Sequence, residues 1–191
     1  MSRMLVRRRA AALWRNWQCA RVARRLPVLT KSEFRALEAK DRYWQGRWGY
    51  LATAIMWLGH GPTAAVLEIG PYKRPLLETA DVLDVRPYAG AGRTTYAWDA
   101  AKTPWPIPDG RYDLLIALQV WEHLGDQQRA AFAEVRRVAR RAILSFPYKW
   151  HCPGDCHHGI DDAVIADWTL HMATTRTELV ENRMPYLFVF P

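Results

Sequence analysis

Three features are absent from this chain, and their absence limits the kinds of protein that it can be. Only 3 of its 191 residues are cysteines, too few for a disulfide framework, which favours a reducing cytoplasm. No apolar run approaches the roughly 20 residues that a membrane-spanning helix requires, and the best candidate, residues 50–59, fits a helix packed on a core. No apolar segment of the signal-peptide type follows the basic N-terminus. The sequence therefore predicts a cytoplasmic protein with one well-buried core.

Acidic residues are absent from the first part of the chain. Residues 1–32 hold eight arginines and one lysine, whereas the rest holds 18 basic and 19 acidic residues, so this segment accounts for the whole net charge of +8. Because the remainder is nearly neutral, nucleic acid is not expected as a partner. Trp14 and Trp17 lie among the arginines, as in interfacial helices. Residues 1–26 are thus expected either to form a solvated face or to dock on an anionic membrane surface, peripherally, or on a protein partner.

Short apolar runs alternate with helical patterns along the rest of the chain, which predicts βαβ units. The expected fold is α/β and doubly wound, with a mainly parallel, seven-stranded, Rossmann-like sheet and a helical N-terminal extension. Strands are expected at 65–69, 82–85, 95–98, 114–118, 142–146, 175–181 and 186–190, with residues 183–185 separating the last two. Helices are expected at 2–26, 31–46, 48–59, 74–79, 126–139 and 161–169, and glycine-rich and proline-rich loops at 87–94 and 103–110. We divide the chain into an extension, residues 1–60, and an α/β domain, residues 61–191.

The turn after the first of these strands contains one glycine where a dinucleotide-binding turn carries three: it reads Gly70-Pro71-Tyr72. A ligand without phosphates therefore fits better than one with a pyrophosphate. Asp84 ends the second strand, where a carboxylate can bind both ribose hydroxyls. Asp99 follows the third strand and can accept a hydrogen bond from the amine of adenine, with Leu118 and Gln119 flanking the ring. Taken singly, Gly70 also fits a simple strand–helix turn and Asp84 a solvated or capping acid.

Together these residues resemble the class I S-adenosylmethionine-dependent methyltransferases of the small-molecule type. Glu68-Ile69-Gly70 is similar to the first motif of that family, Asp84 to its ribose acid and Asp99-Ala100 to the acid near adenine. Residues 112–115 and 120–124 are similar to the fourth-strand motif and the helix start after it. The resemblance covers about residues 63–148. It implies S-adenosylmethionine as the cofactor, with seven residues at its site: Glu68, Gly70, Asp84, Asp99, Ala100, Leu118 and Gln119.

The resemblance also implies methyl transfer to a small-molecule or glycan-like acceptor. A sulfonium is a permanent cation, which acids and aromatic faces suit, and Glu68, Tyr72 and Trp98 are candidates for that contact. The departure from the family is Pro71-Tyr72-Lys73, where most members carry further glycines. It leaves an alternative open, a non-catalytic, degenerate module that docks to a membrane or partner through its basic N-terminal arm.

Histidines are the candidate bases. Methyl transfer from a sulfonium needs mainly alignment and a dry site, and a base only when the acceptor keeps its proton. His123 opens the helix after the fourth strand and is preferred over His157 and His158, although a helix-terminal histidine bonded to backbone is the simpler interpretation. Loop 151–158 contains a Cys-x3-Cys spacing with flanking histidines, which suits zinc. Because no second Cys/His pair lies elsewhere, the loop is predicted to hold no metal and to face the acceptor.

Overall fold

The computed structural model describes residues 3–86 and 93–191 and contains a seven-stranded sheet. The strands are β1 Val66–Ile69, β2 Asp81–Asp84, β3 Thr95–Ala97, β4 Leu114–Leu118, β5 Arg141–Pro147, β6 Arg176–Thr177 and β7 Arg183–Val189. Their order is β3-β2-β1-β4-β5-β7-β6, and the first five are parallel. β7 runs antiparallel to both β5 and β6. The predicted mainly parallel, Rossmann-like α/β fold is thus confirmed, while the loop expected at 87–94 falls mostly outside the described residues.

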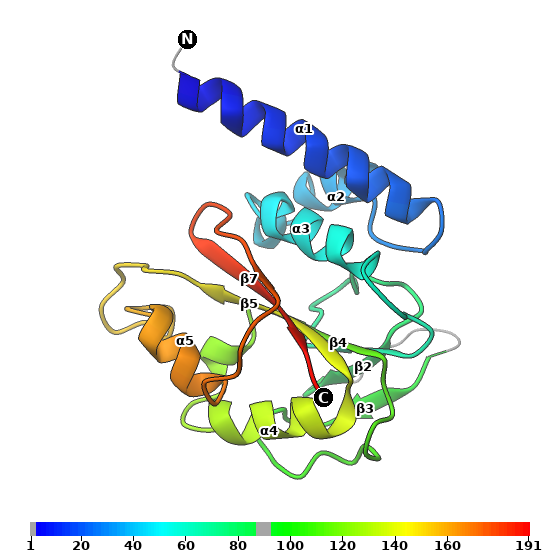
Figure 1. Cartoon of the computed structure of the whole chain (residues 1–191), viewed down its shortest axis with the longest axis vertical. Coiled ribbons are helices and arrows are strands. Elements are labelled where there is room, and N and C mark those ends of the chain that lie inside the picture. The colour runs from blue at the N-terminus through cyan, green and yellow to red at the C-terminus, as the bar shows by residue number, and fades with distance from the viewer. Residues whose placement is uncertain (1–2, 87–92) are drawn as a thin grey trace.

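Helices cover both faces of the sheet (Figure 1). One face carries α1 Arg3–Ala23, α2 Lys31–Glu38 and α3 Trp48–Leu58, and the other carries α4 Gln128–Val138 and α5 Asp162–Trp168. Two short 3-10 turns, η1 Arg42–Trp44 and η2 Trp121–His123, complete the set. Within the described part of the chain, no helix combines the length and the apolar character needed to cross a bilayer.

The central strands are apolar without interruption because both of their faces are buried. Side chains alternate between the two faces of a strand. Leu115 and Ala117 of β4 belong to the hydrophobic cluster under α4 and α5, whereas Leu114 and Ile116 belong to the cluster under α3. A parallel strand covered on both sides is expected to read in this way.

The N-terminal helices are tied to this core. The predicted capping box is present: Glu33 N donates to Thr30 Oγ1, and Thr30 N donates to Glu33 Oε2 at 2.8 Å. The Cys19 thiol of α1 donates to the carbonyl of Ala52 on α3 at 3.1 Å. Residues 50–58 are all buried and share a hydrophobic cluster with the sheet. The boundary drawn at residue 60 stays a prediction, and α3 contributes to the core of the strands that follow it.

One predicted helix is absent. The structure has no helix at 74–79, because the backbone there pairs with a distant segment instead. Leu29 N donates to Leu76 O at 2.8 Å, and Glu78 N donates to Pro27 O at 2.8 Å. These long-range hydrogen bonds replace the local ones that a helix would make. The crossover from β1 to β2 is therefore an extended strap held against residues 27–29.

Three other boundaries were wrong. The strand expected at 175–181 is limited to the two residues of β6, Arg176–Thr177. The helix expected at 31–46 ends at Glu38, and Asp41 then starts a separate turn by accepting from Tyr43 N at 2.9 Å. β7 begins at Arg183, so residues 183–185 belong to the strand and do not precede it. Pro185 is tolerated there because it lacks only a donor, and its carbonyl accepts from Glu178 N of the neighbouring chain segment.

Candidate active site

The carboxyl ends of the parallel strands bring the predicted cofactor residues to one edge of the sheet. Gly70 follows β1, Asp84 is the last residue of β2, and Gln119 follows β4. β2, β1 and β4 are neighbours in the sheet, and Asp99 lies two residues after β3, which pairs with β2. In open α/β sheets this edge is where ligands bind. The roles assigned to these residues stay predictions.

The backbone conformation favours glycine at position 70. Its φ is +59°, and a Cβ there would lie 3.2 Å from Val120 Cγ2. Tyr72 also has a positive φ, +57°, without being glycine. Its ring lies 4.0 Å from that of Tyr43, and its hydroxyl donates to Asp41 Oδ2 at 3.2 Å. The turn that departs from the family pattern is thus held in its left-handed conformation by the N-terminal extension.

A narrow crevice with a volume of about 20 Å³, room for about one water molecule, lies at this turn. It brings Glu68, Gly70 and Leu118 together, whereas the other four predicted cofactor residues do not line it. Aromatic side chains of the N-terminal extension form part of its wall: Tyr43, Trp44 and Tyr50. Sequence reasoning missed these three residues, because nothing in their local pattern indicates which part of the sheet they cover.

Glu68 is buried, and it stabilises the turn from within. Its Oε2 accepts from Leu76 N at 2.7 Å, so the carboxyl group anchors the strap between β1 and β2. Burial raises the pKa of Glu68 to about 8, and the hydrogen bonds from the backbone of Leu76 and Leu77 only partly oppose this effect. At neutral pH the group is therefore mostly protonated, and it offers little negative charge to a sulfonium.

Asp84 and Asp99 are half-buried, and each uses one carboxylate oxygen to fix its own loop. Asp84 Oδ1 accepts from Arg86 N at 3.0 Å, and Asp99 Oδ1 accepts from Ala101 N at 3.0 Å. The second oxygen of each makes no hydrogen bond with another described residue. Two acceptors from adjacent strand ends are therefore left for the polar groups of a ligand.

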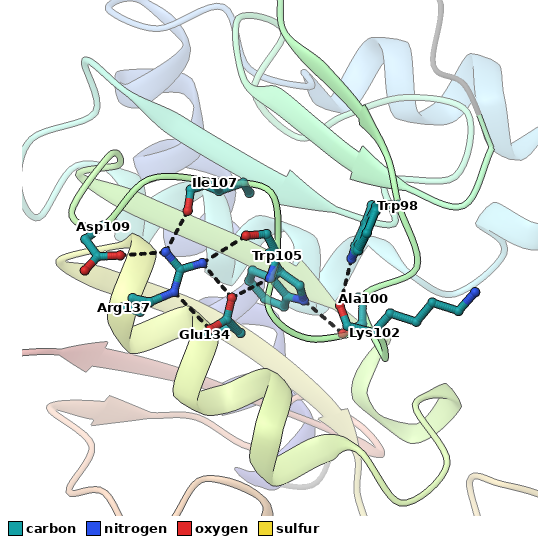
Figure 2. A network of polar contacts seen from close by, with 8 residues as sticks. All are labelled: Trp98, Ala100, Lys102, Trp105, Ile107, Asp109, Glu134 and Arg137. Atoms are coloured by element: carbon teal, nitrogen blue, oxygen red, sulfur yellow. Dashed lines mark hydrogen bonds and ion pairs between the residues drawn. The ribbon is translucent and has the colours of Figure 1, made fainter.

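Two tryptophans hold the loop that carries Asp99 (Figure 2). Trp98 Nε1 donates to the carbonyl of Lys102 at 2.7 Å, and Trp105 Nε1 donates to the carbonyl of Ala100 at 3.0 Å. Ala100 is buried, so it contributes to the predicted site only through its backbone, which Trp105 holds in place. Trp98, a candidate for the sulfonium contact, is instead engaged in this loop.

Two residues on α4 anchor the same loop from below (Figure 2). Glu134 Oε2 accepts from Trp105 N at 2.6 Å, and Arg137 donates to Glu134 and Asp109 and to the carbonyls of Trp105 and Ile107. The hydrogen bond from the Arg137 guanidinium lowers the pKa of Glu134 below its ordinary value. The charged pair thus positions the proline-rich connector and, through Trp105, the Asp99 loop.

The candidate bases lie after β4 and β5. His123 Nδ1 is 3.4 Å from Cys156 Sγ, and the rings of His123 and His157 are 5.2 Å apart. Burial, followed by the charge of His157, lowers the pKa of His123, so its imidazole is neutral at neutral pH. His158 is engaged elsewhere, because its Nδ1 accepts from Cys152 N at 3.1 Å. The fold brings together two of the three predicted histidines.

An aromatic and cationic wall adjoins these histidines. Arg47 Nη1 donates to the Tyr50 hydroxyl at 3.1 Å, and the Arg183 guanidinium lies 5.2 Å from the centre of the Tyr50 ring and 5.3 Å from that of Trp150. Trp150 in turn stacks on His157, with ring centres 5.5 Å apart. Tyr50 is buried and Trp150 is engaged by Arg183 and His157, so the groups that this wall can present to a ligand are the hydrogen-bond donors of Arg47 and Arg183.

The comparisons with known proteins identify the fold. No family model matches the sequence. No curated protein matches it either. Among solved structures, the N-methyltransferase NodS from Bradyrhizobium japonicum WM9 is 18% identical, with a TM-score of 0.56 over 79% of this chain and 98% of that one. The PH0226 protein from Pyrococcus horikoshii OT3 is 13% identical, with a TM-score of 0.62 over 79% and 92%. The chain therefore has the fold of class I S-adenosylmethionine-dependent methyltransferases.

The comparisons do not support the prediction that nucleic acid is not a partner of this protein. The 16S rRNA methylase RmtB is 14% identical, with a TM-score of 0.57 over 93% of this chain and 74% of that one. The exclusion relied on the near-neutral charge of residues 33–191 alone. In the structure the basic helix α1 packs against α3 and is part of the same body, so its charge cannot be set aside.

Proposed function

We propose that the protein is an S-adenosylmethionine-dependent methyltransferase that acts on an oxygen or nitrogen atom of a small-molecule or glycan-like acceptor. The observation that carries this proposal is the pair of half-buried acids, Asp84 and Asp99, at adjacent strand ends beside a turn without a phosphate cradle. Asp84 is assigned to the ribose hydroxyls, Asp99 to the adenine amine, and Leu118 and Gln119 to the sides of the ring.

The residues present fit the nucleoside part of this cofactor. Each acid has a carboxylate oxygen that makes no hydrogen bond with another described residue. Glu68 is mostly neutral at neutral pH, so it contributes little to binding the sulfonium. When bound, the cofactor supplies an activated methyl group.

The protein then has to align the methyl donor with the acceptor and to exclude water from the site. Arg47 and Arg183 are placed to orient a polar acceptor on the side of β5. The neutral imidazole of His123 stays the predicted base for an acceptor that keeps its proton. The non-catalytic alternative is not favoured, because both acids are present and no described residue binds the second carboxylate oxygen of either. A cytoplasmic location, with peripheral attachment to anionic membranes through residues 1–26, completes the proposal.

Thermal unfolding of the full chain with different nucleosides tests this function. S-adenosylhomocysteine at about 100 times its Kd should stabilise the protein by about 2.7 kcal/mol, or about 5–10 °C in Tm. ATP and NAD at the same concentration should not raise Tm, because the single-glycine turn offers no nest for their phosphates. The proposal fails if S-adenosylhomocysteine gives no shift, or if ATP and NAD stabilise the protein equally.

A further inference from the structure

Three metal-binding side chains from separate strand ends meet on the acceptor side of the sheet. His123 ends η2, after β4, whereas Cys156 and His157 lie in the loop after β5. Their ligand atoms all lie within 4.8 Å of one another. Cys156 Sγ is 3.4 Å from His123 Nδ1 and 3.4 Å from His157 Nδ1. The loop was expected to hold no metal because no second Cys/His pair lies elsewhere, and no local pattern links His123 to Cys156, 33 residues away.

The two sulfur–nitrogen distances match those that a tetrahedral ion requires. Zinc binds thiolate sulfur at about 2.3 Å and imidazole nitrogen at about 2.0–2.1 Å, which places sulfur and nitrogen ligands about 3.6 Å apart. Both observed sulfur–nitrogen distances are within about 0.2 Å of this value. We propose that His123 Nδ1, Cys156 Sγ and His157 Nδ1 bind a zinc ion. This inference does not depend on the proposed cofactor.

A buried carboxylate completes the arrangement behind His157. Glu122 is 4% exposed, and neither of its carboxylate oxygens makes a hydrogen bond with another described residue. A buried carboxylate without a partner is costly. Its Oε1 lies 3.8 Å from His157 Nε2, the ring nitrogen that points away from Cys156. Histidines that bind zinc commonly donate their other ring N–H to a carboxylate, which fixes the tautomer and orients the ring.

Zinc binding at this site requires the loss of protons from its ligands. Cys156 gives up its thiol proton to solvent when zinc binds, so binding weakens as pH falls. Asp155 Oδ1 contacts His157 Nδ1, so zinc takes the place of the proton between them, and His157 then carries its proton on Nε2, the nitrogen that faces Glu122. Zinc on its Nδ1 excludes the role of base proposed above for His123, so stoichiometric zinc binding by the wild type decides between the two roles.

Zinc titration of the chelator-treated full chain against a chromophoric zinc chelator tests the proposal. We expect one zinc ion per chain, and we expect His123→Ala, Cys156→Ser and His157→Ala each to weaken binding by more than about 100-fold. Glu122→Gln should weaken it by about 10–100-fold, as loss of an orienting carboxylate does. Cys152→Ser and His158→Ala are matched controls from the same loop, and both should bind zinc as the wild type does.

His123→Ala is the decisive variant, because His123 is exposed and lies outside the loop, so its loss should leave the fold intact. Circular dichroism checks that fold. With cobalt in place of zinc, the thiolate charge-transfer band should be present in Cys152→Ser and absent in Cys156→Ser. Failure of the folded wild type to bind zinc stoichiometrically overturns the site. So does zinc binding that survives His123→Ala and is lost in Cys152→Ser, since the loop alone would then hold the ion.

Discussion

Replacement of Glu68 by glutamine should remove a pH dependence from the folding stability of this protein. Burial raises the pKa of this carboxyl group from 4.5 to about 8. Between these values the folded protein keeps a proton that the unfolded chain has released. Unfolding therefore releases a proton, and the free energy of unfolding falls as pH rises from about 4.5 through about 8. Below that window both states are protonated, and the contribution of Glu68 no longer changes.

The size of this effect follows from the pKa shift. Each pH unit inside the window changes the free energy of unfolding by up to about 1.4 kcal/mol. Glutamine stays neutral at every pH, and its amide oxygen can still accept from Leu76 N. The free energy of unfolding of Glu68→Gln, minus that of the wild type, should therefore increase by about 2–3 kcal/mol between pH 5 and pH 7. The burial that raises the pKa of Glu122 to about 8 acts equally in both proteins and cancels in the difference.

Urea unfolding followed by tryptophan fluorescence at pH 5, 6 and 7 measures this difference. Glu78→Gln is the matched control, because Glu78 is exposed and lies at the opposite edge of the sheet, before β2. Its stability should follow that of the wild type at each pH. Parallel curves for Glu68→Gln and the wild type would refute the assignment of a buried, protonated glutamate at this turn.

Three further perturbations test other parts of the account. Trp105→Phe loses the indole hydrogen bond to the Asp99 loop, and it should lower the free energy of unfolding by about 1–3 kcal/mol in urea titrations and weaken S-adenosylhomocysteine binding. Gly70→Ala places a Cβ at positive φ, and it should destabilise the fold by about 1–2 kcal/mol and weaken the same binding. Trp14→Ser with Trp17→Ser, both 53% exposed, should abolish sedimentation with anionic vesicles, which high salt should also weaken.

Each of these three expectations has an outcome that contradicts it. Unchanged stability in Trp105→Phe would mean that its hydrogen bond to Ala100 is replaced by water. Unchanged ligand affinity in Gly70→Ala would place the ligand away from the β1 turn. Val85→Ser, which replaces an exposed apolar residue directly after β2, is the control for the vesicle assay. If wild-type protein does not sediment with anionic vesicles at low salt, residues 1–26 form only a solvated face.

Some of this architecture could be predicted from the sequence because local chemistry determines it. The apolar run 114–118 matches β4 residue for residue, since a strand buried on both faces leaves no other reading of so short a segment. The Thr30–Glu33 capping box is likewise local and is present as predicted. The acids at 84 and 99 were placed correctly at strand ends because the carboxyl ends of parallel strands share one edge.

Other features depend on contacts between distant segments, and local patterns did not indicate them. The expected helix at 74–79 is replaced by pairing with residues 27–29, which a single segment cannot reveal. The aromatic wall of the crevice comes from Tyr43 and Trp44, which reach β1 only through the packing of the N-terminal helices. The approach of His123 to Cys156 needs the conformations of two loops at once.

Calorimetric titration of the full chain with S-adenosylhomocysteine tests the central claim most directly, through Asp84. The account predicts one binding site in the wild type. It predicts an affinity lower by about tenfold to a hundredfold in Asp84→Ala, because a charge-assisted contact worth about 1.5–3 kcal/mol is lost. Glu78→Ala, which removes an exposed acid from the opposite edge of the sheet, should bind as the wild type does. Equal affinity in Asp84→Ala, or no binding by the folded wild type at millimolar ligand, would contradict the account.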